Sequence, residues 1–469
     1  MAKIQFFGAA QTVTGSCHML TIGNRRFLLD AGQFQGPWEI EKLNYGKFGF
    51  MPSNVQGLIL SHGHLDHCGR IPLLKKRGFD KEIYCTPPTA DIAMLILMDS
   101  AHILKEEFVW KQRRLTRAGI KVKEPLYSIE DVYYCLNLFR RGVPYNRKIA
   151  IAPDVNLTFH LNDAGHILGS AQIVLEYREK RGETRKILFT GDLGDGNRPT
   201  VDDPAPPEKD IDALIMESTY GDRDHKSYEA SVEELEEAIT STIKRRGTVL
   251  IPTFALERTQ EMLYHIGNMK RSGKLSKRIP VFLNSPLAIN ITRIYEKHCD
   301  YCHMFKSGRF DRRHSPFEFP GLFFTETVEE SKAIHGVTGP KIVLAGSGMM
   351  TGGRIKHHLK HLLWKDSTTL IIVGFQAQGT LGRRIIEGAD QVRIFGEPVA
   401  VRARVYTING FSAHADRTNL LAYAKKARPK KLFIVHGEPD AQKMLAKSLQ
   451  KALPATETHV PRLGQHYPV

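Results

Sequence analysis

The chain has 469 residues, of which 66 are Lys or Arg and 50 are Asp or Glu, so its formal net charge is +16. Hydrophobic residues make up 42% and charged residues 25%, a globular balance that excludes a disordered, collagen-like or low-complexity chain. No run approaches the roughly 20 apolar residues of a membrane-spanning helix, so we expect no membrane segment.

Short strands without helices between them are predicted before residue 60, where glycines separate apolar runs, and this indicates an antiparallel meander. Across the chain, β-branched or aromatic runs that end in a polar residue or Gly are predicted as buried strands. They lie at 26–30, 56–61, 186–192, 213–218, 248–253, 281–285, 341–346, 369–374 and 431–436. From about residue 210 the strands alternate with helical patterns at 228–244, 256–269 and 416–426, which predicts an α/β layered sheet.

Five polar residues lie at or just beyond the C-terminal end of a predicted strand. They are Asp30, His62, Asp192, Glu217 and His436. Open α/β sheets place their functional sites at these strand ends, so the five are candidates for one site. For any one of them alone, Asp30 in particular, the alternative is a side chain that caps the following helix.

Residues 61–69 read Ser-His-Gly-His-Leu-Asp-His-Cys-Gly and contain the motif H-x-H-x-D-H. Its four polar side chains are His62, His64, Asp66 and His67. In a loop between a strand and a helix, His62 and His64 can point toward one metal ion, while Asp66 and His67 face a second. The motif therefore predicts a site for two metal ions.

Two metal ions need more ligands than this motif supplies, and other strand ends offer them. His166 lies in Ala-Gly-His-Ile-Leu, Asp192 in Thr-Gly-Asp-Leu and His436 in Val-His-Gly-Glu. Either histidine alone is better explained as a core or surface residue, but the set completes a binuclear site. Asp192 is the expected bridging carboxylate, because its two oxygens can bind two cations. Imidazole suits zinc best, and carboxylate also accepts manganese or iron.

The cysteines and the net charge give two further expectations. Six cysteines scattered between residues 17 and 302 are too few for a disulfide framework, so we expect a reducing compartment, with the cytoplasm as the default. The net charge of +16 favours a polyanionic partner such as nucleic acid. Many basic proteins bind no nucleic acid, so charge alone leaves the partner open.

These motifs resemble those of a known superfamily. Five features of this chain resemble the signature elements of the metallo-β-lactamase superfamily. They are Asp30, the run at 62–67, His166, Asp192 and the final histidine His436. The resemblance implies an α/β protein with the αββα metallo-β-lactamase fold.

The second half of the chain narrows the resemblance to one subgroup. Glu217, His414 in Gly-Phe-Ser-Ala-His-Ala-Asp, and His436 resemble motifs A, B and C of the β-CASP subgroup. This subgroup consists of RNA-processing nucleases that include RNase J and the nuclease subunit of the cleavage and polyadenylation specificity factor. Three further segments, 251–255, 284–288 and 346–349, are also similar to it. Its RNA-directed members carry histidine at motif C, whereas DNA-directed repair members tend to carry valine.

The resemblance implies how the chain is divided. A first part of the metallo-β-lactamase domain is expected at 1–220, an inserted α/β β-CASP domain at 221–390, and the second part, with motifs B and C, at 391–469. No stretch resembles the N-terminal KH-like domains of archaeal relatives or the C-terminal domain of RNase J. We therefore expect a minimal bacterial-type member.

The resemblance also assigns roles to residues. One metal ion would be bound by His62, His64 and His166 and the other by Asp66, His67 and His436, with Asp192 shared. The ions are expected to be two Zn²⁺ per chain, with Mn²⁺ as the alternative, and water activated between them would attack phosphorus. His414 would be the general acid, and Glu217 would accept its other N–H. Without the family, Glu217 is equally explained as a helix cap or a salt-bridged carboxylate. Asp30 would orient metal ligands without binding metal.

Basic and Gly-rich segments are candidates for contacts with the RNA backbone. The residues concerned are Ser347, Arg354, Arg383 and Arg384. Gly-rich loops let backbone N–H groups approach phosphates, and Arg adds bidentate hydrogen bonds. A solvated basic helix face is the alternative. A second basic run, 111–123, follows Phe108 and Trp110, whose rings either stack on bases or belong to the core.

The sequence therefore predicts a zinc-dependent hydrolase that cuts phosphodiester bonds of single-stranded RNA, as an endo- or 5′-exoribonuclease or both, in RNA processing or decay. Two other functions stay open: a superfamily hydrolase of a small ester or thioester, and a non-catalytic RNA-binding scaffold. The intact ligand set argues against the scaffold, and motifs A to C with the net charge of +16 argue against the ester hydrolase. Cleavage mode, RNA preference, physiological metal, cellular pathway and oligomeric state, a homodimer included, are left undetermined.

Overall fold

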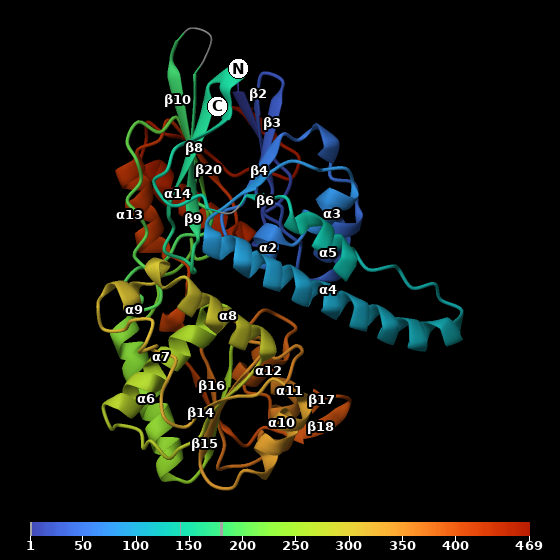
Figure 1. The fold of residues 1–469 in the computed structure, drawn as a ribbon, viewed down its shortest axis with the longest axis vertical. Coiled ribbons are helices and arrows are strands. Elements are labelled where there is room, and N and C mark those ends of the chain that lie inside the picture. Colours follow the sequence, from blue (N-terminus) through green and yellow to red (C-terminus); the bar gives the residue numbers. More distant parts are fainter. Residues whose placement is uncertain (1, 141, 179–181) are drawn as a thin grey trace. The chain divides into compact units, whose positions relative to one another are not determined.

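A computed structural model of the protein describes residues 2–140, 142–178 and 182–469, which form two compact units (Figure 1). Unit 1 comprises Met1–Asn197, Asp202–Asp224 and His414–Val469, and unit 2 comprises Arg198–Val201 and His225–Ala413. Unit 2 is thus an insertion into the chain of unit 1. The described helices include none that is long and apolar enough to cross a membrane.

Unit 1 contains two seven-stranded sheets among its described residues. The first consists, in spatial order, of β22 (His466–Pro468), β1 (Ala2–Phe6), β2 (His18–Ile22), β3 (Arg25–Leu29), β4 (Gly57–Ile59), β5 (Ile83–Tyr84) and β6 (Phe139–Arg140). Strands β22 to β3 pair antiparallel, and β3 to β6 pair parallel. The meander predicted before residue 60 is present as β1, β2 and β3.

The second sheet of unit 1 joins segments from both sides of the insertion. It consists of β21 (Glu457–His459), β20 (Lys431–Ile434), β11 (Ala213–Met216), β10 (Thr184–Phe189), β9 (Ala171–Arg178), β8 (Leu157–Asp163) and β7 (Ile149–Ala152). Strands β7 to β10 pair antiparallel, whereas β10, β11, β20 and β21 pair parallel. β11 and β20 are therefore neighbours although unit 2 lies between them in the sequence.

The layers of unit 1 follow from the alternation of side chains along its strands. One face of each sheet supplies a shared apolar core that contains Phe6 and Phe27 of the first sheet and Phe159 and Phe189 of the second. Helices cover both outer faces. The helices of unit 1 are α1 (Trp38–Glu41), α2 (Leu65–Cys68), α3 (Ile71–Lys76), α4 (Pro87–Leu115), α5 (Ile129–Leu136), α13 (Arg417–Ala427) and α14 (Pro439–Ala452). This is the αββα arrangement, with α13 and α14 on the second sheet (Figure 1).

Unit 2 is built on a parallel sheet, six-stranded over residues that are all described. Its strands are β14 (Leu322–Phe324), β13 (Val281–Asn284), β15 (Lys341–Ala345), β12 (Thr248–Pro252), β16 (Thr369–Ile372) and β19 (Arg404–Thr407), and β17 (Gln391–Ile394) and β18 (Glu397–Ala400) form a separate hairpin. Its helices are α6 (Tyr228–Lys244), α7 (Arg258–Arg271), α8 (Pro286–Lys297), α9 (His303–Lys306), α10 (Val328–Ala333), α11 (Ile355–Leu362) and α12 (Leu381–Ile386). The compact unit continues to Ala413, beyond residue 390, because β19 pairs with β16.

A buried charged cluster lies at the start of α7 in unit 2. Glu257 is only 4% exposed, and the hydroxyls of Thr200 and Tyr295 both donate to its carboxylate. Arg258 pairs with the neighbouring buried Glu261. Burial, with the charge of Glu261, raises the pKa of Glu257 from 4.5 to about 7. The folded state therefore binds a proton at Glu257 more tightly than the unfolded state does.

This proton makes the stability of unit 2 depend on pH. A carboxyl group whose pKa is raised on folding stabilises the protein below its unfolded value of 4.5, and the contribution is lost as pH rises toward about 7. We expect the free energy of unfolding of the wild type to fall by roughly 2–3 kcal/mol over this range relative to Glu257→Gln, which cannot ionise. Urea unfolding at a series of pH values measures it, with the exposed Glu318→Gln as control. Parallel curves for wild type and Glu257→Gln would contradict this assignment.

Candidate active site

The loop between β4 and α2 presents the four polar side chains of the H-x-H-x-D-H motif. His64 caps α2 with an extended backbone, φ −68° and ψ 150°, so that Asp66 and His67 fall in the first turn of the helix. Gly63 packs directly against α4, where an added Cβ would lie 2.5 Å from Cγ2 of Ile92. A residue with a side chain at position 63 would therefore push the loop away from α4.

The first group of converging side chains consists of His62, His64, His166 and Asp192, which offer atoms that all lie within 4.8 Å of one another. Nδ1 of His64 is 3.0 Å from Nε2 of His62 and 3.2 Å from Nε2 of His166. Oδ2 of Asp192 is 3.5 Å from Nε2 of His62 and 3.6 Å from Nε2 of His166. Three imidazoles and one carboxylate thus face a common point.

The second group consists of Asp66, His67 and His436. Nε2 of His436 is 3.2 Å from Nε2 of His67 and 3.4 Å from Oδ2 of Asp66. Asp192 also approaches this group, with Oδ2 3.3 Å from Nε2 of His67 and Oδ1 3.4 Å from Nδ1 of His436. Asp192 is therefore the one carboxylate among the predicted ligands that contacts histidines of both groups.

Asp30 is buried and contacts side chains next to both groups. Its carboxylate is 2.7 Å from Nδ1 of His67 and accepts hydrogen bonds from the backbone N–H and hydroxyl of Ser61 and from the hydroxyl of Ser16. Because Asp30 takes the proton of Ser61, Nδ1 of His62, 3.0 Å from the same hydroxyl, is the donor to Ser61. Nε2 of both imidazoles therefore faces the centre.

Ser61 and Thr219 contact predicted ligands, although the sequence did not single them out. Oγ1 of Thr219 is 3.1 Å from Nδ1 of His436 and thereby fixes the ring of that histidine. His436 itself has φ 50° and Asp30 has φ 62°, a left-handed conformation that costs about 1–3 kcal/mol in residues other than glycine. Ser61 directly precedes the motif in the sequence, but its neighbouring residues do not indicate that its hydroxyl contacts Asp30.

Burial and the clustered charges shift the pKa values of these groups. Burial, with the charge of His67, holds the pKa of His62 well below its usual value, and burial lowers the pKa of His64 to about 4 despite Asp66. Burial alone would raise the pKa of Asp192, but the surrounding histidines, His436 first, hold it well below its usual value. For His67 the carboxylates of Asp192 and Asp30 outweigh burial and raise the pKa. Burial and the clustered charges thus lower the pKa of some histidines of the centre and raise that of another.

These groups fit metal ions on the evidence of their own chemistry. Nδ1 of His62 faces Ser61 and Nδ1 of His67 faces Asp30. Nε2 of each of these rings instead faces a ring nitrogen of another histidine at 3.0–3.2 Å, and a third such pair joins His64 and His166. Oδ1 of Asp192 is buried and accepts no hydrogen bond. Converging lone pairs and an unsatisfied buried carboxylate oxygen are what a divalent cation requires.

His414 and Glu217 lie beside the two groups, within unit 1. Nδ1 of His414 is 3.1 Å from both carboxylate oxygens of Glu217 and 4.0 Å from Oδ2 of Asp192. Glu217 is buried, and the backbone N–H of Leu193 also donates to it at 2.7 Å. Burial lowers the pKa of His414, but Glu217 outweighs this and raises it to about 9. The His414 side chain remains 21% exposed, so its ring has access to solvent.

The residues predicted to contact RNA lie in unit 2 and have protein partners. Arg354 donates to Oδ1 of Asn284 and to the backbone oxygens of Thr325 and Glu326, and Arg383 pairs with Glu387. Oγ of Ser347 lies 3.4 Å from the backbone oxygen of Gly352, and Arg384 is exposed. A role of these four residues in RNA binding stays a prediction.

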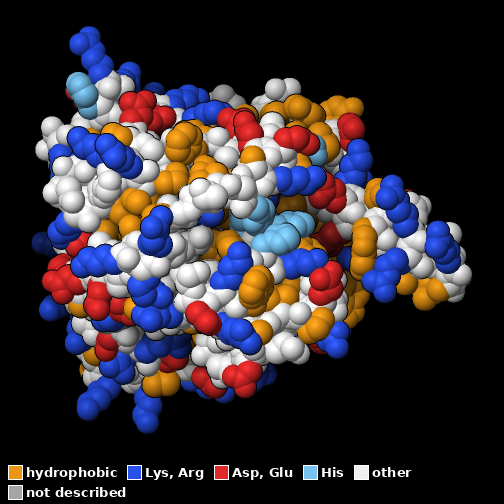
Figure 2. Space-filling view, turned by 90° about the horizontal axis from the view of Figure 1, so that it is seen from below, with side chains coloured by type: hydrophobic (Ala, Val, Ile, Leu, Met, Phe, Trp, Pro, Cys, Tyr) orange, Lys and Arg blue, Asp and Glu red, His pale blue; other side chains and the backbone are white. Residues whose placement is uncertain are grey.

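The second basic run belongs to the end of α4 and the residues after it. Trp110 is 57% exposed and Phe108 half-buried, so the ring of Trp110 is not part of the core. Figure 2 shows Lys and Arg side chains (blue) beside hydrophobic ones (orange) on the projection at its right edge, to which α4 extends in Figure 1.

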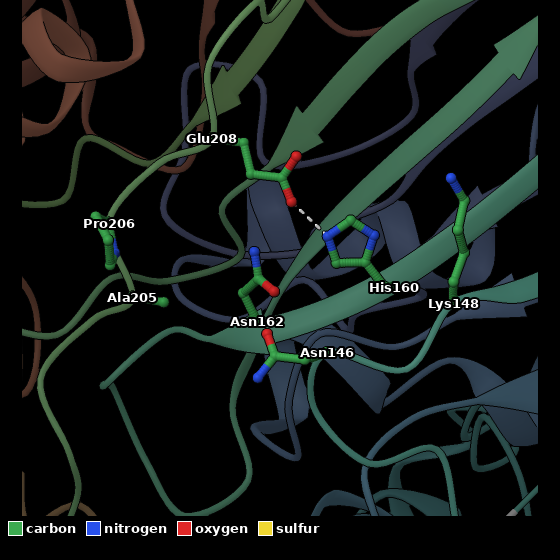
Figure 3. A pocket seen from close by; sticks show the side chains of 7 residues that line it. All are labelled: Asn146, Lys148, His160, Asn162, Ala205, Pro206 and Glu208. Atoms are coloured by element: carbon green, nitrogen blue, oxygen red, sulfur yellow. Dashed lines mark hydrogen bonds and ion pairs between the residues drawn. The ribbon is translucent and has the colours of Figure 1, made fainter.

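A separate hollow of about 400 Å³ lies on unit 1, around β8 (Figure 3). It is lined by Asn146, Lys148, His160, Asn162, Ala205, Pro206 and Glu208, and its His160 pairs with Glu208. None of the predicted metal ligands lines it.

Comparison with known families finds three matches along the chain. Residues 11–135 match the metallo-β-lactamase superfamily, residues 259–385 the β-CASP domain, and residues 398–461 a Zn-dependent metallo-hydrolase RNA specificity domain. A crystal structure of a protein of unknown function from Enterococcus faecalis superposes with a TM-score of 0.54 at 12% identity, over 99% of each chain. That likeness supports the fold alone.

Two relatives match over the full length of both chains, and a third matches most of this chain. Ribonuclease TTHA0252 of Thermus thermophilus is 38% identical over 100% of both chains, and an RNase J-like protein of Methanocaldococcus jannaschii is 34% identical over 100% of both. Transcription termination factor FttA of Methanosarcina mazei is 30% identical over 96% of this chain and 69% of its own. The chain therefore belongs to the β-CASP subgroup of the metallo-β-lactamase superfamily, and it is a metal-dependent RNA nuclease.

Proposed function

We propose that the protein hydrolyses phosphodiester bonds of single-stranded RNA with two zinc ions per chain. The observation that carries this proposal is the convergence of seven ligand side chains with the His414–Glu217 pair in one unit. His62, His64 and His166 would hold one ion and Asp66, His67 and His436 the other, with Asp192 between them. When bound, the ions supply Lewis acidity that activates water and offsets charge on the phosphate.

The residues around the ligands hold the imidazole rings in place and keep their protons on the nitrogens that face away from the ions. Asp30 keeps Nδ1 of His67 protonated and, through Ser61, that of His62, so Nε2 of each ring is directed at an ion. Thr219 fixes His436 in the same way from the opposite side of its ring. A scaffold without catalysis would have no need of so many oriented imidazoles.

His414 is the proposed proton donor. Glu217 holds Nδ1 of His414, which leaves Nε2 as the nitrogen that can give a proton to the leaving oxygen. Because Glu217 is buried and accepts further hydrogen bonds from the backbone, its carboxylate is fixed and can orient the ring.

Hydrolysis of a small ester would also use the metal ligands, but the names of the two full-length relatives favour RNA as the substrate.

The substrate is tested by comparing single-stranded RNA with duplex DNA of the same sequence. We expect single-stranded RNA to be cut much faster, and its binding to weaken steeply with salt because phosphate contacts release counterions. Resolving the products of 5′-labelled RNA then gives the cleavage mode: internal fragments indicate an endonuclease, and early mononucleotides a 5′-exonuclease. Equal rates on duplex DNA would contradict the RNA assignment, and a flat salt response would contradict extensive phosphate contact.

Three further features belong to the proposal. We assign residues 1–220 and 391–469 to the catalytic domain and 221–390 to the inserted β-CASP domain, which the family matches at 11–135, 259–385 and 398–461 support. Within the last segment, β17, β18 and β19 pack in compact unit 2. The scattered cysteines favour the cytoplasm. A homodimer is the proposed assembly to test first, by light scattering at several protein concentrations.

A further inference from the structure

The helix α4 has two halves with different surroundings. Its buried residues end at Ala101, and none of the following residues, all described, is buried again before Leu126. The helix nevertheless continues to Leu115, which at 1.5 Å per residue is about 21 Å beyond Ala101. We call residues 102–124 the arm; in Figure 1 this end of α4 extends past α3 and α5.

The arm is strongly basic. From Phe108 to Lys123 it carries six basic residues and no Asp or Glu. The six are Lys111, Arg113, Arg114, Arg117, Lys121 and Lys123, all exposed. Arg113 and Arg114 are favourable at a helix C-terminus in any protein, because they interact with the helix dipole. That reason does not apply to Lys121 or Lys123, which lie beyond the helix and beyond the 3₁₀ turn at Thr116–Ala118 that contains Arg117.

One face of the arm combines cations with exposed aromatic rings. Trp110 and Arg114 are four residues apart, and the Arg114 guanidinium lies 4.8 Å from the centre of the indole ring. Lys111 is on the same face and pairs with Glu107 at 3.0 Å, the one acidic contact there that the structure gives. An exposed Trp beside Arg forms a surface on which a nucleobase can stack.

The base of the arm adds two more rings. Nζ of Lys123 lies 3.8 Å from the ring centre of Tyr45, and the rings of Tyr45 and Trp38 are 6.3 Å apart. Burial raises the pKa of Tyr45; the charge of Lys111 acts against this rise and the charges of Glu107 and Glu41 add to it, so this face of α4 is close to Tyr45. Trp38, Tyr45, Trp110, Lys111, Arg114 and Lys123 are the basic–aromatic surface.

The first turn of α4 is anchored to the loops that carry metal ligands. The hydroxyls of Thr86 and Thr89 donate to the backbone oxygen of Gly169, 2.7 and 2.8 Å away, in the loop that follows His166. Ile92 packs on Gly63, the residue that separates His62 from His64 in the sequence. From Ile92 to Trp110 the helix rises about 27 Å, so a strand that touches both the metal centre and Trp110 must span several nucleotides.

We propose that the basic–aromatic surface binds single-stranded RNA outside the active site, with phosphates on its Lys and Arg side chains and a base stacked on Trp110. This inference rests on the proposed function. A second copy of the chain is disfavoured as occupant, because two arms that each bear the same positive charges repel one another. RNA matches both features of the surface, the positive charge and the exposed ring.

Substrate length separates this surface from the catalytic centre. We compare single-stranded RNAs of about 4 and about 20 nucleotides, since only the longer can occupy both sites. For Trp110→Ala we expect the ratio of kcat/KM on long over short RNA to fall about tenfold, through KM, the loss of one stacked base. For the triple variant Lys111→Gln/Arg114→Gln/Lys123→Gln we expect a similar fall in this ratio. The slope of log binding constant against log salt concentration for the long RNA should also become shallower by about 2, since each phosphate contact contributes about 0.7 to this slope.

A matched control comes from α14, where Lys443, Lys447 and Lys451 are exposed. Their triple change to Gln removes the same three charges and should leave the length ratio unaltered. Metal content and circular dichroism verify that each variant is folded. If the arm variants keep the wild-type length ratio, the inference is wrong while the proposed function stands; if the wild type cuts neither RNA, the proposed function itself fails. A Trp110→Ala variant that changes only the oligomeric state would instead assign the surface to a second copy and overturn the RNA assignment.

Discussion

His64→Ala is expected to lose at least one of two bound metal ions, and nuclease activity with it. His64 contributes one of three ring nitrogens that converge on a single point, and a methyl group cannot replace it. Removing a group that only orients a metal ligand lowers activity roughly 10- to 100-fold. The loss of activity in His64→Ala should be larger than this. Elemental analysis of the purified variant, together with RNA cleavage, measures both effects.

Asp30→Asn provides the comparison within the same centre. Asp30 contacts no metal-facing nitrogen and acts on Nδ1 of His67 and through Ser61, so its loss should weaken metal binding only about 10- to 100-fold. The exposed His466→Ala is the control for a histidine lost elsewhere. Full metal content and full activity in His64→Ala would rule out the binuclear assignment.

His414→Ala is expected to keep both metal ions and to bind RNA nearly normally, yet to lose roughly 10²–10⁴ in cleavage rate. The reason is that His414 holds Glu217 through Nδ1, and this nitrogen lies 4.0 Å from the nearer oxygen of Asp192. His436→Ala should instead weaken metal binding, since it removes a ring nitrogen 3.2 Å from that of His67. Metal analysis distinguishes the two variants.

An activated substrate tests the proton transfer directly. RNA with sulfur in place of the leaving oxygen needs little protonation, so it should restore much of the rate of His414→Ala and none of the rate of His436→Ala. The acid role of His414 is wrong if both variants lose metal alike, or if the activated substrate rescues neither.

Much of the fold was predictable because its signals are local. Each of the nine predicted strand ranges overlaps an observed strand, since buried strands are continuous apolar runs. The helix predicted at 228–244 has the observed bounds of α6, with Ser227 as its cap. The helix predicted from residue 256 begins at Arg258, because Glu257 takes φ 65° to place its carboxylate in the buried cluster.

The site was less predictable where it depends on tertiary contacts. The metal ligands could be named because they follow strands and match a family pattern, although their roles stay predictions. Ser61 and Thr219 could not, since a hydroxyl gives no pattern, and Thr219 meets His436 across 217 residues of sequence. The sequence likewise left the rings of Phe108 and Trp110 open between core and surface, and only the end of the packing at Ala101 decides between them.

The pairing of β11 with β20 has a consequence for when the enzyme becomes active. A ribosome releases β11 and Glu217 first, then residues 225–413 of unit 2, and only afterwards His414 and His436. A nascent chain that ends before residue 414 therefore has Glu217 without its histidine and Asp192 without His436. The catalytic centre therefore cannot form before His436 has left the ribosome, so cleavage of RNA must wait until the segment that follows unit 2 has been made.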